Sequence, residues 1–159
     1  MAEATADSQN TVTPVLTGAQ LSELMHLARR LPAAPSIVRY AVPLARATRP
    51  DAPEATPDVK KYVSWGAGPR ASQYLILGAK ARVAMDGRAM PDLDDAVATA
   101  MPVLAHRVVL NFQAEAEGVS AMKMVARLRR ASLEAGESVG NKAHRQSTSS
   151  FQGNPRNAN

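Results

Sequence analysis

Residues 69–86 are apolar around most of their circumference when they are placed on a helical wheel. Arg70, Gln73 and Lys80 lie in a narrow polar sector, within about 80° of one another at roughly 100° per residue. Such a helix must lie at the centre of a bundle, because it has no broad polar face to turn toward water. Gly87 is the expected C-terminal cap, since glycine adopts the backbone conformation that ends helices.

The rest of the chain supports an all-α fold of about five helices. With one Trp, three Tyr and two Phe, the core must consist mainly of Ala, Leu, Val and Met. Thr17 and Gln20 form a capping-box pattern before a helix that ends near Pro32. Further helices are expected from about Pro35, from Asp92 and from Ser120 to Gly136.

The expected buried faces follow helical spacing. They comprise Leu21, Leu24, Met25, Ala28 and Leu31 in the first helix, Ile37, Tyr40, Ala41 and Leu44 in the second, Leu93, Ala96, Val97, Ala100, Met101 and Leu104 in the fourth, and Met122, Val125, Leu128 and Leu133 in the last. Pro43 predicts a kink or an early end of the second helix, and Pro102 a bend or restart of the fourth. Residues 50–58 are expected to form an exposed loop, and residues 106–110 an extended segment.

Three regions follow from these patterns. Residues 1–13 are a disordered leader of small and polar residues, 14–136 are the helical domain, and 137–159 are a disordered tail rich in Ser, Asn, Gln and Gly. The polar start of the chain is unlike a signal peptide, and no apolar run approaches the roughly 20 residues of a membrane span. A cytoplasmic location is therefore expected.

The composition also limits the chemistry. The chain has no cysteine, so disulfides and thiolate metal sites are excluded, and no metal site is expected. Asp94 and Asp95 are explained by helix capping, because carboxylates favour the positive end of a helix. His26 and His106 have no catalytic or ligand-spaced partners. No catalytic residue is therefore proposed.

The candidate site is the segment Trp65–Ser72, with the sequence WGAGPRAS. Gly68 is an acceptable N-cap, and Pro69 suits the first helical position because it has no N–H to leave unpaired. Arg70 is thereby fixed in the first helical turn, where its guanidinium could hold a phosphate with two parallel hydrogen bonds. The alternative is that Arg70 is only a solvated residue at a helix start.

Several segments, in order, resemble the MoxR-type AAA+ ATPases. They are WGAGPRASQYLILGAKA at Trp65–Ala81, MPVLAHR at Met101–Arg107 and NFQAEAEG at Asn111–Gly118, with supporting matches at Val38–Ala41 and Arg46–Pro50. In that family, this region is the helical lid that follows the nucleotide-binding core. The resemblance covers about residues 14–133. It implies that Arg70 is the second-sensor arginine that contacts the γ-phosphate of ATP, with Gly68 and Gln73 as weaker nucleotide-binding candidates.

The resemblance also implies what the lid works with. Mg²⁺-bound ATP and the core are its cofactor and partner, and lids of this family pack against neighbouring subunits of a ring in chaperone-like ATPases, often with von Willebrand factor A proteins. The phosphate loop G-x-x-x-x-G-K-[ST] is absent from the chain, and so is the acidic magnesium-binding segment. By itself the chain is therefore not expected to hydrolyse ATP.

Two other functions stay open. The net charge of +5 permits a helical DNA-binding or protein-interaction module. The arginines are spread over several helices without interleaved aromatics, and only the last helix gathers them. A solvated basic face, or one turned toward nucleotide and a neighbouring subunit, is favoured over specific nucleic-acid binding. The third possibility is an inactive, truncated remnant.

Overall fold

The computed structural model describes the backbone of residues 13–149 and the side chains of residues 13–135. Within them lie seven α-helices and a two-stranded antiparallel sheet. The elements in chain order are α1 (Gly18–Arg30), α2 (Pro35–Ala47), α3 (Pro57–Tyr62), β1 (Val63–Trp65), α4 (Arg70–Met85), α5 (Leu93–Leu104), β2 (Val109–Leu110), α6 (Phe112–Ala116) and α7 (Ala121–Ser149). The predicted all-α class is confirmed.

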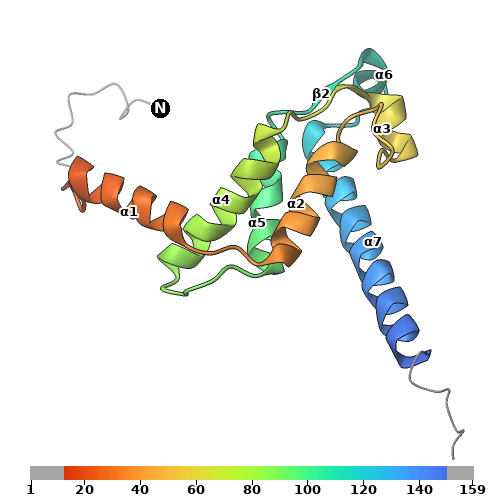
Figure 1. The fold of residues 1–159 in the computed structure, drawn as a ribbon. Helices are drawn as coiled ribbons and strands as arrows, with labels where there is room; N and C mark the ends of the chain where they lie inside the picture. The colour runs from red at the N-terminus through yellow and green to blue at the C-terminus, as the bar shows by residue number, and fades with distance from the viewer. Residues whose placement is uncertain (1–12, 150–159) are drawn as a thin grey trace, which may run out of the picture.

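Helix α4 is the centre of the arrangement, as its apolar sequence predicts. It packs against α5, α2 and α1, while α7 packs against α2 and α5 (Figure 1). Even so, Tyr74 and Met85 of α4 are exposed, so its apolar circumference is not buried on every side. The largest fully buried side chains come from α2, α4, α5 and α7, and include Ile37, Leu44, Leu75, Leu104, Met124 and Leu128.

Small residues bring α4 and α5 close together. A Cβ atom added to Gly78 of α4 would lie 3.0 Å from the Thr99 Cγ2 atom of α5. The Thr99 hydroxyl also donates to the Leu75 carbonyl at 3.3 Å, which ties the two helices at the same level. Fully buried alanines on both helices complete this close contact: Ala71, Ala79, Ala96 and Ala100.

Local capping explains the helix ends. Thr17 and Gln20 form the expected capping box at α1. Gly87, with a φ of 69°, follows the end of α4, where the Arg88 N–H donates to the Val83 carbonyl at 2.9 Å and the Gly87 N–H to the Ala84 carbonyl at 3.3 Å. This pair of bonds is the Schellman motif, which requires left-handed backbone at the glycine.

Both internal prolines are accommodated within continuous helices. Pro43 lies inside α2, which runs on to Ala47, so the expectation of an early end for this helix is wrong. Pro102 lies inside α5, which runs to Leu104 without a restart. Packing of the flanking residues Ala41, Leu44, Ala45, Ala100 and Leu104, all buried, offsets the backbone bond that each proline removes.

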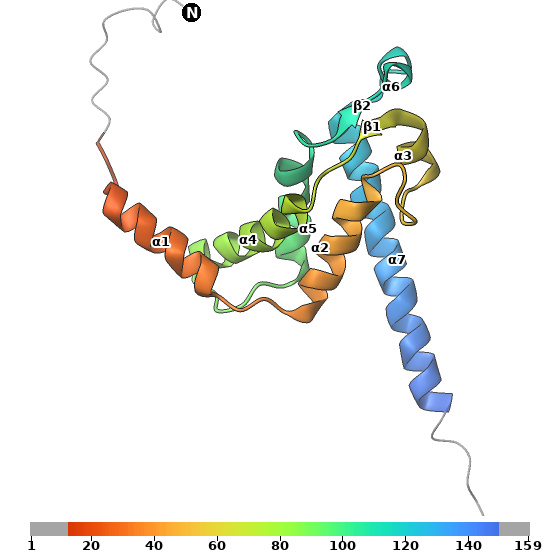
Figure 2. The same cartoon turned by 45° about the horizontal axis from the view of Figure 1, so that its top comes forward.

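The sequence did not predict the small cluster of α3, β1, β2 and α6 at one end of the molecule (Figure 2). The strands pair antiparallel, with Val63 opposite Leu110 and Trp65 opposite Val109, so the expected extended segment at 106–110 is confirmed in part. Asn111 closes the cluster, because its N–H donates to the Tyr62 carbonyl at 2.9 Å and its side-chain amide to the Lys61 carbonyl at 2.7 Å. Helix α3 begins at Pro57, inside the region expected to be a loop.

Three expectations about burial are wrong. The apolar stripe of α1 is largely exposed: Leu21 is 52% and Met25 is 55% exposed, and Ala28 is the buried residue of this helix. Met122, expected to face inward, is 62% exposed, and the buried methionine of α7 is Met124, two positions later. Leu93 is also exposed, because α5 buries the Ala96–Ala100–Leu104 face instead.

Helix α7 continues to Ser149 and does not end at Gly136. In both views, α1 and the C-terminal part of α7 project away from the body on different sides (Figures 1 and 2). The expected disordered leader lies, except for Thr13, outside the described residues, and so do residues 150–159 of the expected disordered tail.

Candidate functional site

The turn before α4 is held by the end of α2. The buried Thr48 hydroxyl donates to the Ala45 carbonyl at 2.7 Å and accepts from the Ala67 N–H at 2.8 Å. The Arg49 Nε atom donates to the Ala67 carbonyl at 2.9 Å. Both backbone polar groups of Ala67 are thus paired with side chains from one short segment, which fixes the position of the turn.

Gly66 allows this close approach. A Cβ atom at this position would lie 2.4 Å from the Thr48 carbonyl oxygen and 2.7 Å from the Arg49 Cα atom. Both are backbone atoms, which cannot move aside as the end of a flexible side chain can. Gly68, two residues later, is exposed, and a Cβ atom there would have no neighbour within 4 Å, so the two glycines serve different purposes.

Arg70 lies in the first turn of α4, as the sequence predicts, but α4 begins at Arg70 with Pro69 as the N-cap, so the predicted N-cap at Gly68 is wrong. Pro69 before it already has helical backbone angles, and the Ala71 N–H donates to the Gly68 carbonyl at 3.0 Å. The Arg70 side chain is exposed and makes no hydrogen bond or ion pair with the part of the chain that the structure describes. The Arg70 guanidinium is therefore available to a ligand, while the turn that carries it is held in place.

The surface beside Arg70 carries further polar groups. A hollow of about 250 Å³ is lined by Arg29, Gln73, Tyr74 and Leu77, so Gln73 faces a concave surface between α1 and α4. Lys80, the third residue of the polar sector, donates instead to the Arg29 carbonyl at 3.4 Å. Gln73 and Lys80 therefore both lie beside Arg29 of α1, whereas Arg70 does not line this hollow.

The sequence did not single out Arg107 as a neighbour of this site. Its guanidinium lies 5.1 Å from the centre of the Tyr74 ring, one helical turn beyond Arg70. It also contacts the Val103 carbonyl and the His106 ring. Because α5 lies beside α4, residues just after its C-terminal end come next to the start of α4. Only the tertiary pairing of these helices reveals this proximity.

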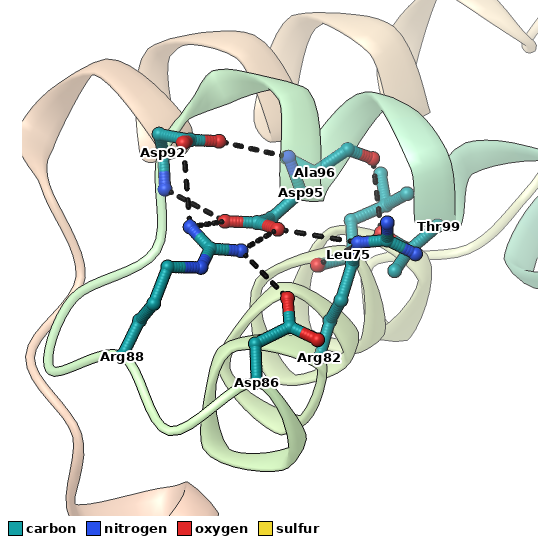
Figure 3. A network of polar contacts seen from close by, with 8 residues as sticks. All are labelled: Leu75, Arg82, Asp86, Arg88, Asp92, Asp95, Ala96 and Thr99. Carbon is teal, nitrogen blue, oxygen red and sulfur yellow. Dashed lines mark hydrogen bonds and ion pairs between the residues drawn. The ribbon is translucent and has the colours of Figure 1, made fainter.

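An ion network ties the other end of α4 to α5 (Figure 3). Asp95 is 3% exposed and accepts from Arg88 at 2.6 and 3.0 Å, with Arg82 at 3.3 Å from the same carboxylate. It also closes the α5 capping box by accepting from the Asp92 N–H at 3.0 Å. Hydrogen bonding to Arg88 lowers the pKa of the Asp95 carboxyl, so Asp95 is ionised at neutral pH.

The acidic residues at the start of α5 do more than the helix capping that the sequence predicts. The predicted capping role is confirmed for Asp95, which forms a capping box with Asp92, whereas Asp94 lies in the first turn without a part in that box. The pairing of Asp95 with two arginines from the preceding segment was not predicted, because a helix-start aspartate is ordinarily exposed. Arg88 follows the left-handed Gly87, which turns the chain back toward α5 and brings the guanidinium to the carboxylate.

Two kinds of feature are absent from the described residues. No helix among them is both long and apolar enough to cross a membrane. Their side chains form no group of three or more His, Cys, Asp or Glu that could hold a metal ion.

Comparison with known proteins agrees with this architecture. The AAA lid domain family matches residues 55–128, which run from just before α3 into α7 and include the turn at Gly66 and Arg70. Residues 55–128 therefore form an AAA lid domain. Together with the relatives described next, this match supports a lid fragment of the MoxR type.

Two proteins illustrate the relationship. Chaperone MoxR1 of Mycobacterium tuberculosis is 35% identical over 85 residues, which are 54% of this chain and 22% of MoxR1. A solved structure of a protein named as a putative ATPase from Cytophaga hutchinsonii superimposes with a TM-score of 0.69 at 26% identity, over 80% of this chain and 39% of the other. The chain thus corresponds to less than half of the length of either relative.

Proposed function

We propose that this domain acts as the lid of a MoxR-type AAA+ ATPase, closing over ATP and Mg²⁺ that a separate nucleotide-binding core holds. In this proposal Arg70 is the second-sensor residue, and its guanidinium contacts the γ-phosphate. The observation that carries the proposal is Arg70, which is exposed on a fixed turn at the start of the central helix and has no hydrogen-bond or ion-pair partner in the part of the chain that the structure describes. The family match at residues 55–128 supports it.

The mechanism is electrostatic. A positive group placed at the terminal phosphate stabilises the charge that develops there during hydrolysis. Arg70 lies at the end of α4, and α4 packs against three other helices. A bond between Arg70 and the γ-phosphate would therefore hold the lid near the core, and loss of the phosphate would release it.

Gly68 and Gln73 have supporting roles in this proposal. Gly68 has no side chain and lies exposed beside the start of α4, so a phosphate can approach the backbone there. Gln73 lies one helical turn from Arg70 and lines the 250 Å³ hollow, where its amide can donate to a nucleotide oxygen. Both contacts are weaker than that of Arg70, because neither residue carries a charge.

The assembly and setting are part of the same proposal. Neighbouring subunits of a ring would contact the lid, and the ring would act in a chaperone-like manner, with von Willebrand factor A proteins as partners. A cytoplasmic location remains a prediction that cell fractionation tests. The similarity to Chaperone MoxR1 supports the chaperone-like role.

The test is a fusion of this chain to a MoxR-type nucleotide-binding core. We expect Arg70→Ala to reduce ATP turnover by about one to three orders of magnitude, the scale for losing a charged group at a transferring phosphate. Arg70→Lys should recover little, because an ammonium group cannot offer two parallel donors. The unfused chain should release no phosphate above background.

The matched control is Arg39→Ala. Arg39 is an exposed arginine of α2 without an ion pair among the described residues. Its loss removes the same charge from the fusion but should leave turnover near normal. Equal effects of the two substitutions would show that Arg70 is only a solvated residue at a helix start.

A further inference from the structure

Helix α7 has two different faces over the residues whose side chains are described. Met124, Val125 and Leu128 are buried against the bundle. The opposite side carries Lys123, Arg127 and Arg130, all exposed, with the half-buried Arg129 at its edge. The buried face explains why the helix packs where it does. It does not explain why basic residues gather on the free side.

The basic side carries a shallow, open groove of about 480 Å³, lined by residues of α7 alone. Its lining consists of three arginines and two apolar residues: Ala126, Arg127, Arg129, Arg130 and Leu133. The groove is the larger of the two hollows described on this domain, and it shares no lining residue with the hollow beside Gln73. It is therefore separate from the proposed nucleotide site.

The three arginines differ in how far their charge is neutralised. Arg127 pairs with Asp58 of α3 at 2.7 Å, which fixes its guanidinium. Arg130 reaches Glu134 on its own helix at only 3.8 Å, and both side chains are at least 70% exposed. Arg129 has no carboxylate within ion-pair distance among the described residues. Arg129 and Arg130 therefore leave positive charge available in the groove, beside Arg127, whose guanidinium is held by Asp58.

Tyr40 of α2 lies close enough to Arg129 to interact with it electrostatically. Its hydroxyl is buried and has no hydrogen-bond partner among the described residues. Burial raises the pKa of Tyr40 to about 12, and the positive charge of Arg129 opposes this shift. Tyr40 is therefore neutral at physiological pH and does not neutralise the charge of Arg129.

We propose that this groove, the α7 arginine groove, binds an acidic segment of a partner protein. Arginine guanidinium groups match carboxylates with two parallel bonds, and two of the three arginines already contact carboxylates of this chain. Ala126 and Leu133 supply apolar surface for the methylene groups of Glu side chains. This proposal is independent of the role proposed for Arg70.

The features favour protein carboxylates over nucleic acid. Nucleic-acid binding surfaces carry a long basic track and aromatic side chains on which bases stack. The α7 arginine groove spans eight residues, contains no aromatic residue and is bordered by two carboxylates, Asp58 and Glu134. A surface this short and without aromatic residues suits a short acidic peptide rather than a nucleic-acid strand.

The experiment uses the full 159-residue chain and a fluorescein-labelled decaglutamate peptide, with binding followed by fluorescence anisotropy at low and at physiological salt. We expect Arg129→Gln/Arg130→Gln to weaken binding about 5- to 10-fold, equivalent to about 1 to 1.4 kcal/mol. The control Arg30→Gln/Arg39→Gln removes the same charge from exposed positions of α1 and α2, and should weaken binding less than 2-fold. Arg129→Lys/Arg130→Lys should fall between these values.

A second measurement does not depend on any variant. Amide NMR signals of residues 126–133 in the unaltered chain should shift on addition of decaglutamate, and those at the start of α4 should not. Equal losses in the two double variants, or shifts spread over all basic surfaces, would show an effect of overall charge and overturn the proposal. Tighter binding of a ten-nucleotide single-stranded DNA at the same salt would also overturn it, in favour of a nucleic-acid surface.

Discussion

The Asp95 network provides the sharpest test of how this lid is held together. Replacing Asp95 with Ala removes four contacts at once: two hydrogen bonds from Arg88, an ion pair with Arg82 and the bond from the Asp92 N–H. The carboxylate is 3% exposed, whereas the side chains of Arg88 and Arg82 are 40% and 55% exposed. The arginines that remain can therefore be solvated by water.

This asymmetry sets the size of the effect. Breaking a fully buried ion pair costs about 3–5 kcal/mol, mostly because one charge stays buried without a partner. Here the remaining charges reach solvent, so this part of the cost largely disappears. Losing half of a capping box costs about 0.5–1 kcal/mol, and losing hydrogen bonds to a charged group adds about 1.5–2 kcal/mol. We expect Asp95→Ala to lower the free energy of unfolding by about 2–3 kcal/mol.

The assay is urea unfolding followed by circular dichroism at 222 nm, with Asp94→Ala as the control. Asp94 lies beside Asp95 in the first turn of α5 but is exposed and makes no side-chain contact among the described residues. Its loss removes only the attraction between a carboxylate and the helix dipole, worth about 0.3–1 kcal/mol. An Asp95→Ala effect no larger than that of Asp94→Ala would refute the reasoning.

Comparison with Asp95→Asn measures how the contribution of Asp95 to the free energy of unfolding depends on pH. Because the pKa of Asp95 is lowered in the folded protein, its ionised form contributes stability above the unfolded pKa of about 4. This contribution is lost as the pH falls through the lower folded-state pKa. The difference in unfolding free energy between the unaltered chain and Asp95→Asn should thus be full at pH 7 and shrink below about pH 4. A difference that stays constant down to pH 2 would contradict the assignment.

Three further predictions concern the stability of the domain and of its helix ends. Tyr40→Phe should stabilise the domain by about 1 kcal/mol, because it removes a buried hydroxyl without a partner among the described residues, and a loss of stability would mean that the hydroxyl is paired in solution. Gly66→Ala should destabilise by about 2–4 kcal/mol in the urea assay, since its Cβ would meet backbone at 2.4 Å, whereas Gly68→Ala should change stability by less than about 0.5 kcal/mol. Thr17→Ala should increase amide hydrogen exchange in the first turn of α1 by about fivefold, equivalent to the roughly 1 kcal/mol of a lost N-cap, and unchanged exchange there would argue against the capping box.

The sequence predicted what depends on local chemistry. The caps at Thr17, Gly87 and Asp92 follow from short-range patterns, and so does the place of Arg70 at the start of α4. The buried face of α2 followed from helical periodicity, because this helix is covered on one side only. The resemblance to AAA+ lids was recognised from several sequence motifs that occur along the chain in the expected order.

The remaining features depend on contacts between distant segments. The clamp of Thr48 and Arg49 on Ala67 joins residues 18 and 19 positions apart, and no local pattern indicates it. The stripe of α1 has the period of a buried helix but stays half exposed, since periodicity shows that a face is apolar and not what covers it. Pro43 does not end α2, because burial of the residues around it offsets one missing backbone bond.

The close packing of α4 and α5 has a mechanical consequence. With Gly78 and Thr99 in contact and a hydroxyl bond at the same level, the two helices cannot slide past each other without a steric clash. At 1.5 Å per residue, the 16 residues of α4 form a lever arm of about 24 Å. A small displacement imposed at Arg70 would therefore be transmitted along α4 to its Gly87 end. The two ends of α4 move together, and α5 moves with them.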